Sequence, residues 1–236
     1  TEELIELCKV ASNYGGMYIS HIRNEDSKVM SALEELIRIS KEADIPSEIY
    51  HLKSSRKPNW SKIDDIIKRV EEVRGQGLKI TADIYTYNAS STGLTGVIPT
   101  WVQEGGHRAW IERMKDPNIR PRLLKDIRKE LSEQPPEGIL MVGFKTSDMS
   151  KKYLSKTVAE AAKMRGQSPE EAIVDMVIED DNRIQCIYFS MSEENIRKKI
   201  KLPWVSFGSD AGVDSARTKD VGAHPRACGS FVSVLG

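Results

Sequence analysis

The sequence has no excess charge of either sign and no long apolar run. Its 236 residues include 35 Lys plus Arg and 35 Asp plus Glu, so the formal net charge is zero. Without a basic field the protein is not expected to bind nucleic acid, and no acidic tail indicates a solvating segment. No run of about 18 apolar residues occurs, so a membrane span is not expected either.

Cysteines are few and far apart in the sequence. The three are Cys8, Cys186 and Cys228, and no C-x-x-C pair occurs. This spacing argues against a zinc ribbon and a thioredoxin-like site. We interpret them as reduced thiols, which are typical of a cytoplasmic protein. The chain starts inside a helical pattern at Thr1 and stops in an apolar stretch, so we expect both ends to be cut from a longer chain.

The first part of the chain alternates between strand-like and helix-like segments. Apolar segments at 17–21, 47–51 and 78–85 predict strands, and amphipathic segments at 27–43 and 58–74 predict the helices between them. Such units favour parallel strands with right-handed crossovers, in either a doubly wound sheet or a (β/α)8 barrel. No G-x-G-x-x-G follows a strand, which weakens the dinucleotide-binding alternative.

A long interruption follows the third predicted strand. Residues 86–137 begin with a stretch rich in Ser, Thr and Gly and continue with two polar helical segments. An insertion of this length is usually a functional cover, although a solvated surface excursion has the same pattern. We therefore predict barrel strand–helix units at 1–94, a lid insertion at 95–137, and the remaining insertion with the final barrel strand at 138–236.

Four polar side chains stand at the carboxyl ends of predicted strands: His21, His51, Tyr85 and Asp210. In a parallel barrel these ends converge on the face where the active site forms. Neutral imidazoles and a carboxylate can bind zinc, so we predict a zinc site at His21, His51 and Asp210. Bound zinc would lower the pKa of its water to about 7, and Asp210 could accept a proton from that water. The alternative is two core histidines and an aspartate that caps a helix.

Three cations could hold a substrate carboxylate. Lys53 and Arg23 each follow a candidate histidine by two residues, so on an extended chain they point to its side. Arg226 follows the pair His224-Pro225. Arginine binds a carboxylate through two hydrogen bonds and lysine acts as a point charge. Each of the three could equally be a solvated surface cation.

Short motifs along nearly the whole chain resemble, in order, those of the D-aminoacylase (N-acyl-D-amino-acid deacylase) family. S-H-I-R-N-E at 20–25 resembles its S/T-H-x-R-x-E signature, and I-Y-H-L-K at 49–53 resembles the next one. D-I-Y-T-Y at 83–87, with the small-residue loop after it, resembles its D-x-Y-P-Y segment. Further likenesses are W-V-Q-E-G-G at 101–106, G-S-D at 208–210 and H-P-R at 224–226.

This resemblance implies an α/β fold of the amidohydrolase superfamily. The chain would be a partial (β/α)8 TIM barrel, strands five to eight with a helical lid insertion. His21 and His51 would be metal ligands from strands five and six, and Asp210 the general base and acid from strand eight. Zinc would be the cofactor.

The resemblance also implies the substrate and its ligands. The reaction would be hydrolysis of the amide bond of an N-acyl-D-amino acid. Lys53, Tyr85, Arg226 and the candidate Arg23 would hold the substrate, and Tyr85 could also polarise the scissile carbonyl. A related amidohydrolase acting on cyclic imides, ureides or dipeptides, or a non-catalytic half-barrel, are the alternatives.

The chain departs from the family pattern in two ways. The H-x-H pair of strand one and the cysteine ligand would lie upstream of Thr1, so we expect an incomplete metal shell. We therefore expect the isolated chain to be inactive. Its partner would be the missing N-terminal half of the barrel. Single motif positions also differ, which affects the expected substrate class. The differing residues are Thr86, Ala211, Cys228, Val232 and Ser233.

Overall fold

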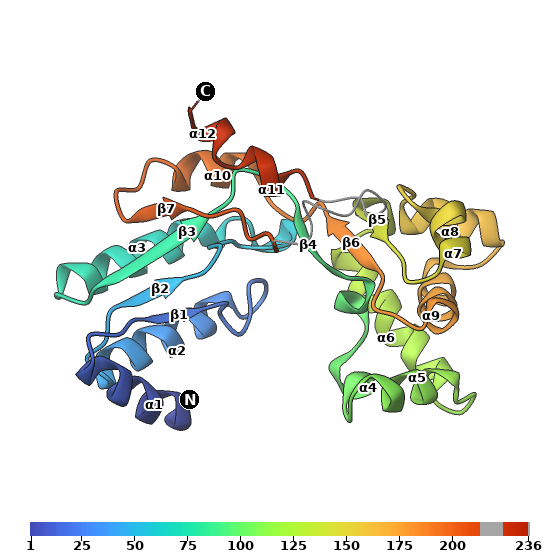
Figure 1. Cartoon of the computed structure of the whole chain (residues 1–236), viewed down its shortest axis with the longest axis horizontal. Coiled ribbons are helices and arrows are strands. Elements are labelled where there is room, and N and C mark those ends of the chain that lie inside the picture. Colours follow the sequence, from blue (N-terminus) through green and yellow to red (C-terminus); the bar gives the residue numbers. More distant parts are fainter. Residues whose placement is uncertain (213–223, 236) are drawn as a thin grey trace. The chain divides into compact units, whose positions relative to one another are not determined.

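The computed structural model describes residues 1–212 and 224–235 of the chain. They form two compact units, each with its own hydrophobic core (Figure 1). The chain leaves unit 1 after its third strand, forms most of unit 2, and then returns to unit 1. Unit 1 consists of Thr1–Asn88, Met191–Ala211 and Pro225–Gly236, and unit 2 of Ala89–Ser190 and Gly212–His224.

Unit 1 contains, within the described residues, a parallel sheet in the order β1-β2-β3-β7. Each strand lies inside an apolar segment that predicts a strand, at 17–21, 47–51, 78–85 and 203–210, and the predicted parallel pairing is confirmed. The strands are β1 (Tyr18–Ser20), β2 (Ser47–Ile49), β3 (Ile80–Ile84) and β7 (Val205–Phe207).

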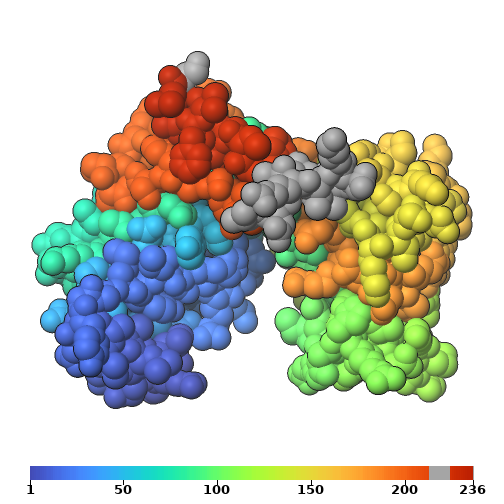
Figure 2. Space-filling model, in the orientation of Figure 1, coloured from blue at the N-terminus to red at the C-terminus, as the bar shows by residue number. Residues whose placement is uncertain are grey.

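Helices of unit 1 join and follow these strands. The predicted helices at 27–43 and 58–74 are present as α2 and α3, the crossovers from β1 to β2 and from β2 to β3. The helical segments are α1 (Glu2–Asn13), α2 (Val29–Glu42), η1 (Lys57–Asn59), α3 (Lys62–Gly75), α10 (Glu193–Lys199), α11 (Arg226–Gly229) and α12 (Val232–Leu235). Figure 2 shows α12, in red, on the outer surface of unit 1.

The two faces of the sheet differ in polarity because side chains alternate along each strand. On β3, Ile80, Ala82 and Ile84 are buried in one core with residues of α2 and α3. Thr81 and Asp83 point to the other face, where they are only partly buried. The helices therefore cover one face, and the second face offers polar groups.

The apolar periodicity of α2 explains its place. Val29, Leu33, Leu36 and Ile37 recur at helical spacing, and all four are buried in the core that contains the sheet. Truncating one such side chain typically costs about 2–5 kcal/mol. Because all four strands are parallel, their carboxyl ends lie along one edge of the sheet, where the candidate site begins.

Unit 2 contains, in its described part, an antiparallel sheet in the order β4-β6-β5. The apolar segments 138–144 and 184–189 predict two of its strands, whereas the Ser- and Gly-rich segment of β4 predicts none. The strands are β4 (Ser90–Gly93), β5 (Ile139–Gly143) and β6 (Gln185–Tyr188). The helical segments are η2 (Leu94–Val97), α4 (Thr100–Gln103), α5 (His107–Lys115), α6 (Arg120–Glu133), η3 (Pro136–Gly138), α7 (Ser147–Tyr153), α8 (Val158–Arg165) and α9 (Pro169–Asp180).

The units divide the chain at other places than the sequence predicts. The first boundary lies after Asn88 and not after residue 94, because β4 pairs with β6 of unit 2. Residues 95–137 share one core with most of 138–190, while 191–211 belong to unit 1. Within the described ranges, no helix has both the length and the apolar character needed to cross a membrane.

Candidate metal centre

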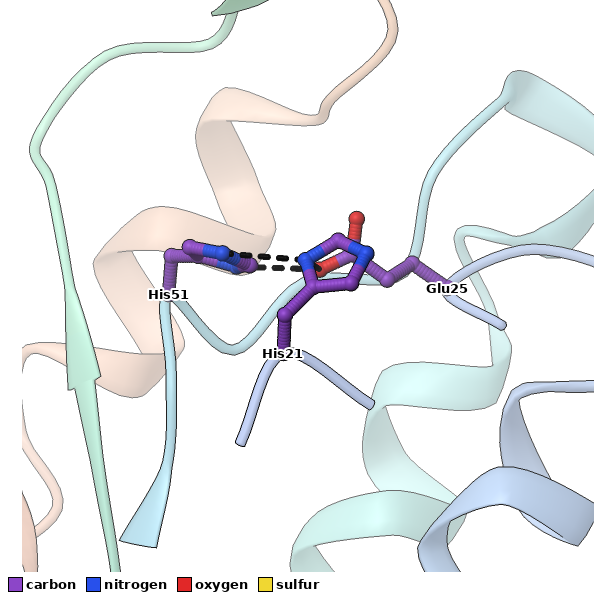
Figure 3. A group of neighbouring side chains, drawn as sticks. All are labelled: His21, Glu25 and His51. Carbon is purple, nitrogen blue, oxygen red and sulfur yellow. Dashed lines mark hydrogen bonds and ion pairs between the residues drawn. The ribbon is translucent and has the colours of Figure 1, made fainter. Parts of the chain in front are cut away.

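His21 and His51 follow neighbouring strands of unit 1, and the structure brings their rings together. His21 comes directly after β1 and His51 two residues after β2. His21 Nδ1 lies 3.1 Å from His51 Nε2, and Figure 3 shows the contact between the two rings, which meet edge to face. The geometric part of the prediction, two histidines from adjacent strands at one rim, is thus present in the structure.

The backbone at His51 adopts an unusual conformation. Its φ of 39° lies in the left-handed region, which is uncommon for residues other than glycine and costs on the order of 1–3 kcal/mol. Two contacts from β3 hold it: the backbone N–H of His51 donates to the carboxylate of Asp83, and Leu52 N donates to Asp83 O at 2.8 Å. The open polar face of the sheet therefore fixes the turn that carries His51.

Glu25 is the third member of the cluster, although the sequence pattern predicts no role for it. Its Oε1 lies 3.0 Å from His51 Nδ1 and 3.7 Å from His21 Nδ1. One ligand atom from each of these three residues lies within 4.8 Å of the others, which makes them the candidate metal group among the described residues. The S-H-I-R-N-E motif contains Glu25, but the chain turns irregularly after β1, so spacing alone did not show where Glu25 points.

Lys53 completes the ionic contacts of Glu25. Its buried Nζ lies 2.7 Å from Glu25 Oε1 and 2.6 Å from His51 Nδ1. Burial alone would raise the pKa of Glu25, but the Lys53 ammonium and the histidines bring it down to about 2. Burial lowers the pKa of Lys53, against the opposing effect of Glu25. The carboxylate therefore stays ionised beside the ammonium.

The protonation of His21 also suits a ligand. Burial lowers its pKa, although the charge of Glu25 acts in the opposite direction. A lower pKa favours the neutral ring at neutral pH, and only a neutral imidazole can bind a metal. The cluster therefore offers an uncharged donor nitrogen and an ionised carboxylate.

Asp210 lies beyond the end of β7 and pairs with Arg226 of α11. Arg226 Nη1 is 2.7 Å from Asp210 Oδ2. The predicted metal-ligand role of Asp210 stays a prediction, because the three-residue cluster contains Glu25 in its place. Asp210 is still close enough for its charge to act on the pKa of Lys53, which burial lowers.

Tyr85 follows β3 and lies between the two buried cations. Lys53 Nζ is 5.6 Å and Arg226 Cζ 4.6 Å from the centre of its ring. Burial raises the pKa of Tyr85, so its hydroxyl stays protonated and can donate a hydrogen bond. The structure thus gathers the predicted residues Lys53, Tyr85, Arg226 and Asp210 in unit 1.

Arg23 is placed differently from the other candidate cations. Its guanidinium binds Glu35 of α2 through two hydrogen bonds of 2.8 Å, and its side chain is 67% exposed. Substrate binding by Arg23 stays a prediction, and this pairing with Glu35 weighs against it.

The donor set and spacing fit a zinc ion. Two nitrogens that bind one tetrahedral zinc at about 2.0–2.1 Å lie roughly 3.3–3.4 Å apart, close to the separation of His21 Nδ1 and His51 Nε2. Glu25 faces the other nitrogen of His51, as carboxylates commonly do when they orient a zinc-binding histidine. The cluster can therefore hold zinc through two nitrogens, with a carboxylate as third ligand or as orienting group.

The comparisons with known proteins agree with the motifs. No family model matches the chain. It is 27% identical over 236 residues to D-aminoacylase of Alcaligenes xylosoxydans xylosoxydans, covering 100% of this chain and 39% of the relative. It is also 27% identical over 234 residues to N-acyl-D-glutamate deacylase of the same organism, covering 99% of this chain and 38% of the relative. The chain is thus homologous to N-acyl-D-amino-acid deacylases and spans about two fifths of their length.

Solved structures show the same fold. N-acyl-D-glutamate deacylase from Bordetella bronchiseptica, complexed with zinc and a phosphonate inhibitor, has a TM-score of 0.72 and 24% identity, over 100% of this chain and 40% of that one. A crystal structure of D-aminoacylase, described as defining a novel subset of amidohydrolases, has a TM-score of 0.69 and 25% identity, again over 100% and 40%. The described α/β fold therefore matches part of an amidohydrolase barrel, and the resemblance found in the motifs is confirmed.

Proposed function

We propose that this chain forms part of the active site of a zinc-dependent hydrolase that cleaves the amide bond of N-acyl-D-amino acids. The observation that carries the proposal is the cluster itself: His21 Nδ1 and His51 Nε2 lie 3.1 Å apart at the ends of adjacent parallel strands. The homology to D-aminoacylase and N-acyl-D-glutamate deacylase supplies the substrate class.

His21 Nδ1 and His51 Nε2 would hold the zinc ion. Glu25 supports this, because its carboxylate lies 3.0 Å from His51 Nδ1 and so helps to hold the ring with Nε2 directed at His21. When bound, zinc would polarise the scissile carbonyl and lower the pKa of a water molecule to about 7. Glu25 is thus the orienting carboxylate of the proposed centre.

Asp210 would move the proton during hydrolysis. It would accept the proton from the attacking water and later give it to the leaving amine. Arg226 keeps this carboxylate in place through the 2.7 Å ion pair. Tyr85, whose hydroxyl stays protonated, would donate a hydrogen bond to the oxygen of the scissile carbonyl as negative charge develops there.

Lys53 and Arg226 would bind the substrate carboxylate. An ammonium has three donors and a guanidinium five, so neither is exhausted by the contact to Glu25 or to Asp210. The buried position of both cations strengthens their attraction for a carboxylate, because water screens them little.

Two finer features belong to the same proposal. The strands β1, β2, β3 and β7 would be strands five to eight of a barrel, and residues 95–137 of unit 2 would act as a lid. Unit 2 begins at Ala89, four residues after Tyr85, so it starts close along the chain to a residue of the site. The relatives have about three fifths of their length outside the matched part, and residues beyond these 236 would supply further strands and ligands.

A substrate panel tests the activity. The full-length protein that contains these residues, loaded with zinc, should release amino acid from N-acyl-D-amino acids and less from their L-enantiomers. The Asp210→Asn variant should keep its zinc and lose most of this turnover, by about a hundredfold or more. Hydrolysis of hydantoins or dipeptides without any action on the acyl-D-amino acids would refute the proposed substrate class, and near-full activity of Asp210→Asn would refute the role of Asp210.

A further inference from the structure

Lys199, the last residue of α10, is a buried lysine that the proposed reaction does not use. It is only 3% exposed. Among the described residues its Nζ has one hydrogen-bond acceptor, the backbone carbonyl of Leu52, at 2.5 Å. Burial lowers the pKa of Lys199 to about 7. Burying an amine with a single acceptor is unfavourable, so stability alone gives no reason for a lysine at this position.

Helix α10 does not need Lys199 to stay in place. Lys198, its neighbour in the helix, pairs with both carboxylate oxygens of Asp64 at 3.0 Å. Asn195 Nδ2 donates to Trp60 O at 2.8 Å, and Ile196 is buried. These contacts hold α10 beside α3, in a position in which Lys199 reaches the Leu52 carbonyl.

Leu52 lies between the two residues that matter most in the proposed site. His51, in its left-handed conformation, precedes it, and Lys53 follows it. On one side Asp83 of β3 binds the N–H groups of His51 and Leu52. On the other side Lys199 binds the Leu52 carbonyl, which belongs to the same peptide unit as the N–H of Lys53. The His51–Lys53 turn is therefore held from both sides.

We propose that Lys199 is a positioning residue: by holding the Leu52 carbonyl it keeps the His51 ring and the Lys53 ammonium in the orientation that zinc and the substrate carboxylate require. This inference rests on the proposed function for its roles of His51 and Lys53. Lys199 touches neither zinc nor substrate. Losing its hydrogen bond would let the turn relax from the left-handed conformation and move both side chains away from Glu25.

The test compares three variants of the full-length protein. Lys199→Met removes the donor and keeps an apolar chain of similar length, and Lys199→Gln keeps a shorter, uncharged N–H donor. Lys198→Met is the matched control, because it is the same substitution in the same helix but breaks the contact to Asp64 instead. Zinc affinity is measured by competition with a chromophoric chelator, the ligand geometry by the visible absorption of the cobalt(II) form, and KM and kcat with an N-acyl-D-amino acid.

Lys199→Met should weaken zinc binding about tenfold, as loss of an orienting contact behind a ligand commonly does, and change the cobalt spectrum. It should also raise KM more than it lowers kcat, because Lys53 binds the substrate carboxylate in the ground state as well as the transition state. Lys199→Gln should recover part of both losses, and Lys198→Met should stay within about twofold of the wild type.

The proposal is overturned if Lys199→Met changes only the unfolding temperature, with zinc affinity, cobalt spectrum and KM within about twofold of the wild type. Losses of zinc affinity and increases in KM in Lys198→Met equal to those in Lys199→Met would likewise overturn the proposal. If Lys199→Met does not fold, Lys199→Leu, which also lacks the donor, is judged by the same criteria. The zinc titration needs no substrate. If the wild-type protein binds zinc but does not hydrolyse acyl-D-amino acids, the proposed activity is refuted. The zinc titration of the variants still measures the effect of Lys199 in that case.

Discussion

Replacing Glu25 by Gln should destabilise unit 1 by about 3 kcal/mol at neutral pH. The substitution keeps the shape of the side chain and removes the charge that pairs with the buried Lys53 ammonium at 2.7 Å. Burial raises the pKa of Glu25, but Lys53 and His51 outweigh it and bring the pKa from 4.5 to about 2. Because a tenfold change in an ionisation equilibrium is about 1.4 kcal/mol, the carboxylate is favoured over a neutral isostere by about 3 kcal/mol. The side chain is 17% exposed, so water screens this interaction little.

The pH dependence follows from the direction of the shift. The folded-state pKa of Glu25 lies below the unfolded value, so between about pH 4.5 and pH 2 the unfolded chain binds more protons than the folded one. The stabilisation is therefore complete at neutral pH and is lost as the pH falls through this window. At pH 3 about 1 kcal/mol should remain.

Urea unfolding at pH 7 and pH 3 measures the loss of unfolding free energy at each pH, with a chelator present to keep the protein free of metal. Glu35→Gln is the matched control, since its pKa is also lowered to about 2, chiefly by the Arg23 side chain. That partner is 67% exposed, so the loss should stay below about 1 kcal/mol. A loss of stability in Glu25→Gln no larger than that in Glu35→Gln at pH 7, or an equal loss at both pH values, would refute stabilisation by the buried ion pair.

Two further predictions concern zinc binding and the stability of unit 2. His51→Ala should weaken zinc binding by more than the roughly 10–100-fold that loss of an orienting contact causes, because it removes a ligand. Equilibrium dialysis measures the zinc affinity, with His107→Ala of unit 2 as control. Equal zinc affinities of the two variants would contradict the prediction. Thr157→Ala should lower the stability of unit 2 by about 1 kcal/mol, because Thr157 and Glu160 form a capping box at the start of α8. Thermal unfolding followed by circular dichroism measures it, and a higher unfolding temperature would count against the capping argument.

The strands and helices of unit 1 were predictable because their apolar residues repeat at the spacing of the elements that they form. The division between the two units was not predictable, because it depends on the pairing of β4. This strand is rich in Ser, Thr and Gly, and it is a strand only because it pairs with β6, about 95 residues further along the chain. Pairing between distant segments has no local signal in the sequence, so residue patterns alone do not show that the units divide after Asn88.

Local patterns in the sequence also set how much of the site could be predicted. His21 and His51 could be found because the carboxyl ends of parallel strands lie at one edge, whatever the detailed geometry. Glu25 and Lys199 could not, because one lies on an irregular turn and the other on a short polar helix in which lysine is usually exposed. Their contacts depend on how the turns bend and the helices dock, which residue spacing does not specify.

The contact between Lys199 and Leu52 also couples the site to the folding of the whole of unit 1. The two residues are 147 positions apart, and most of unit 2 is inserted between them. The proposed ligands His21 and His51 both precede the segment 89–190 of unit 2, whereas α10 and Asp210 follow this segment. The orientation of His51 is therefore complete only in molecules in which residues 191–211 have docked on the sheet. An ion that binds the oriented histidines more tightly than the unoriented ones must, by linkage, stabilise the docked state. The stabilisation equals the difference between the two binding free energies.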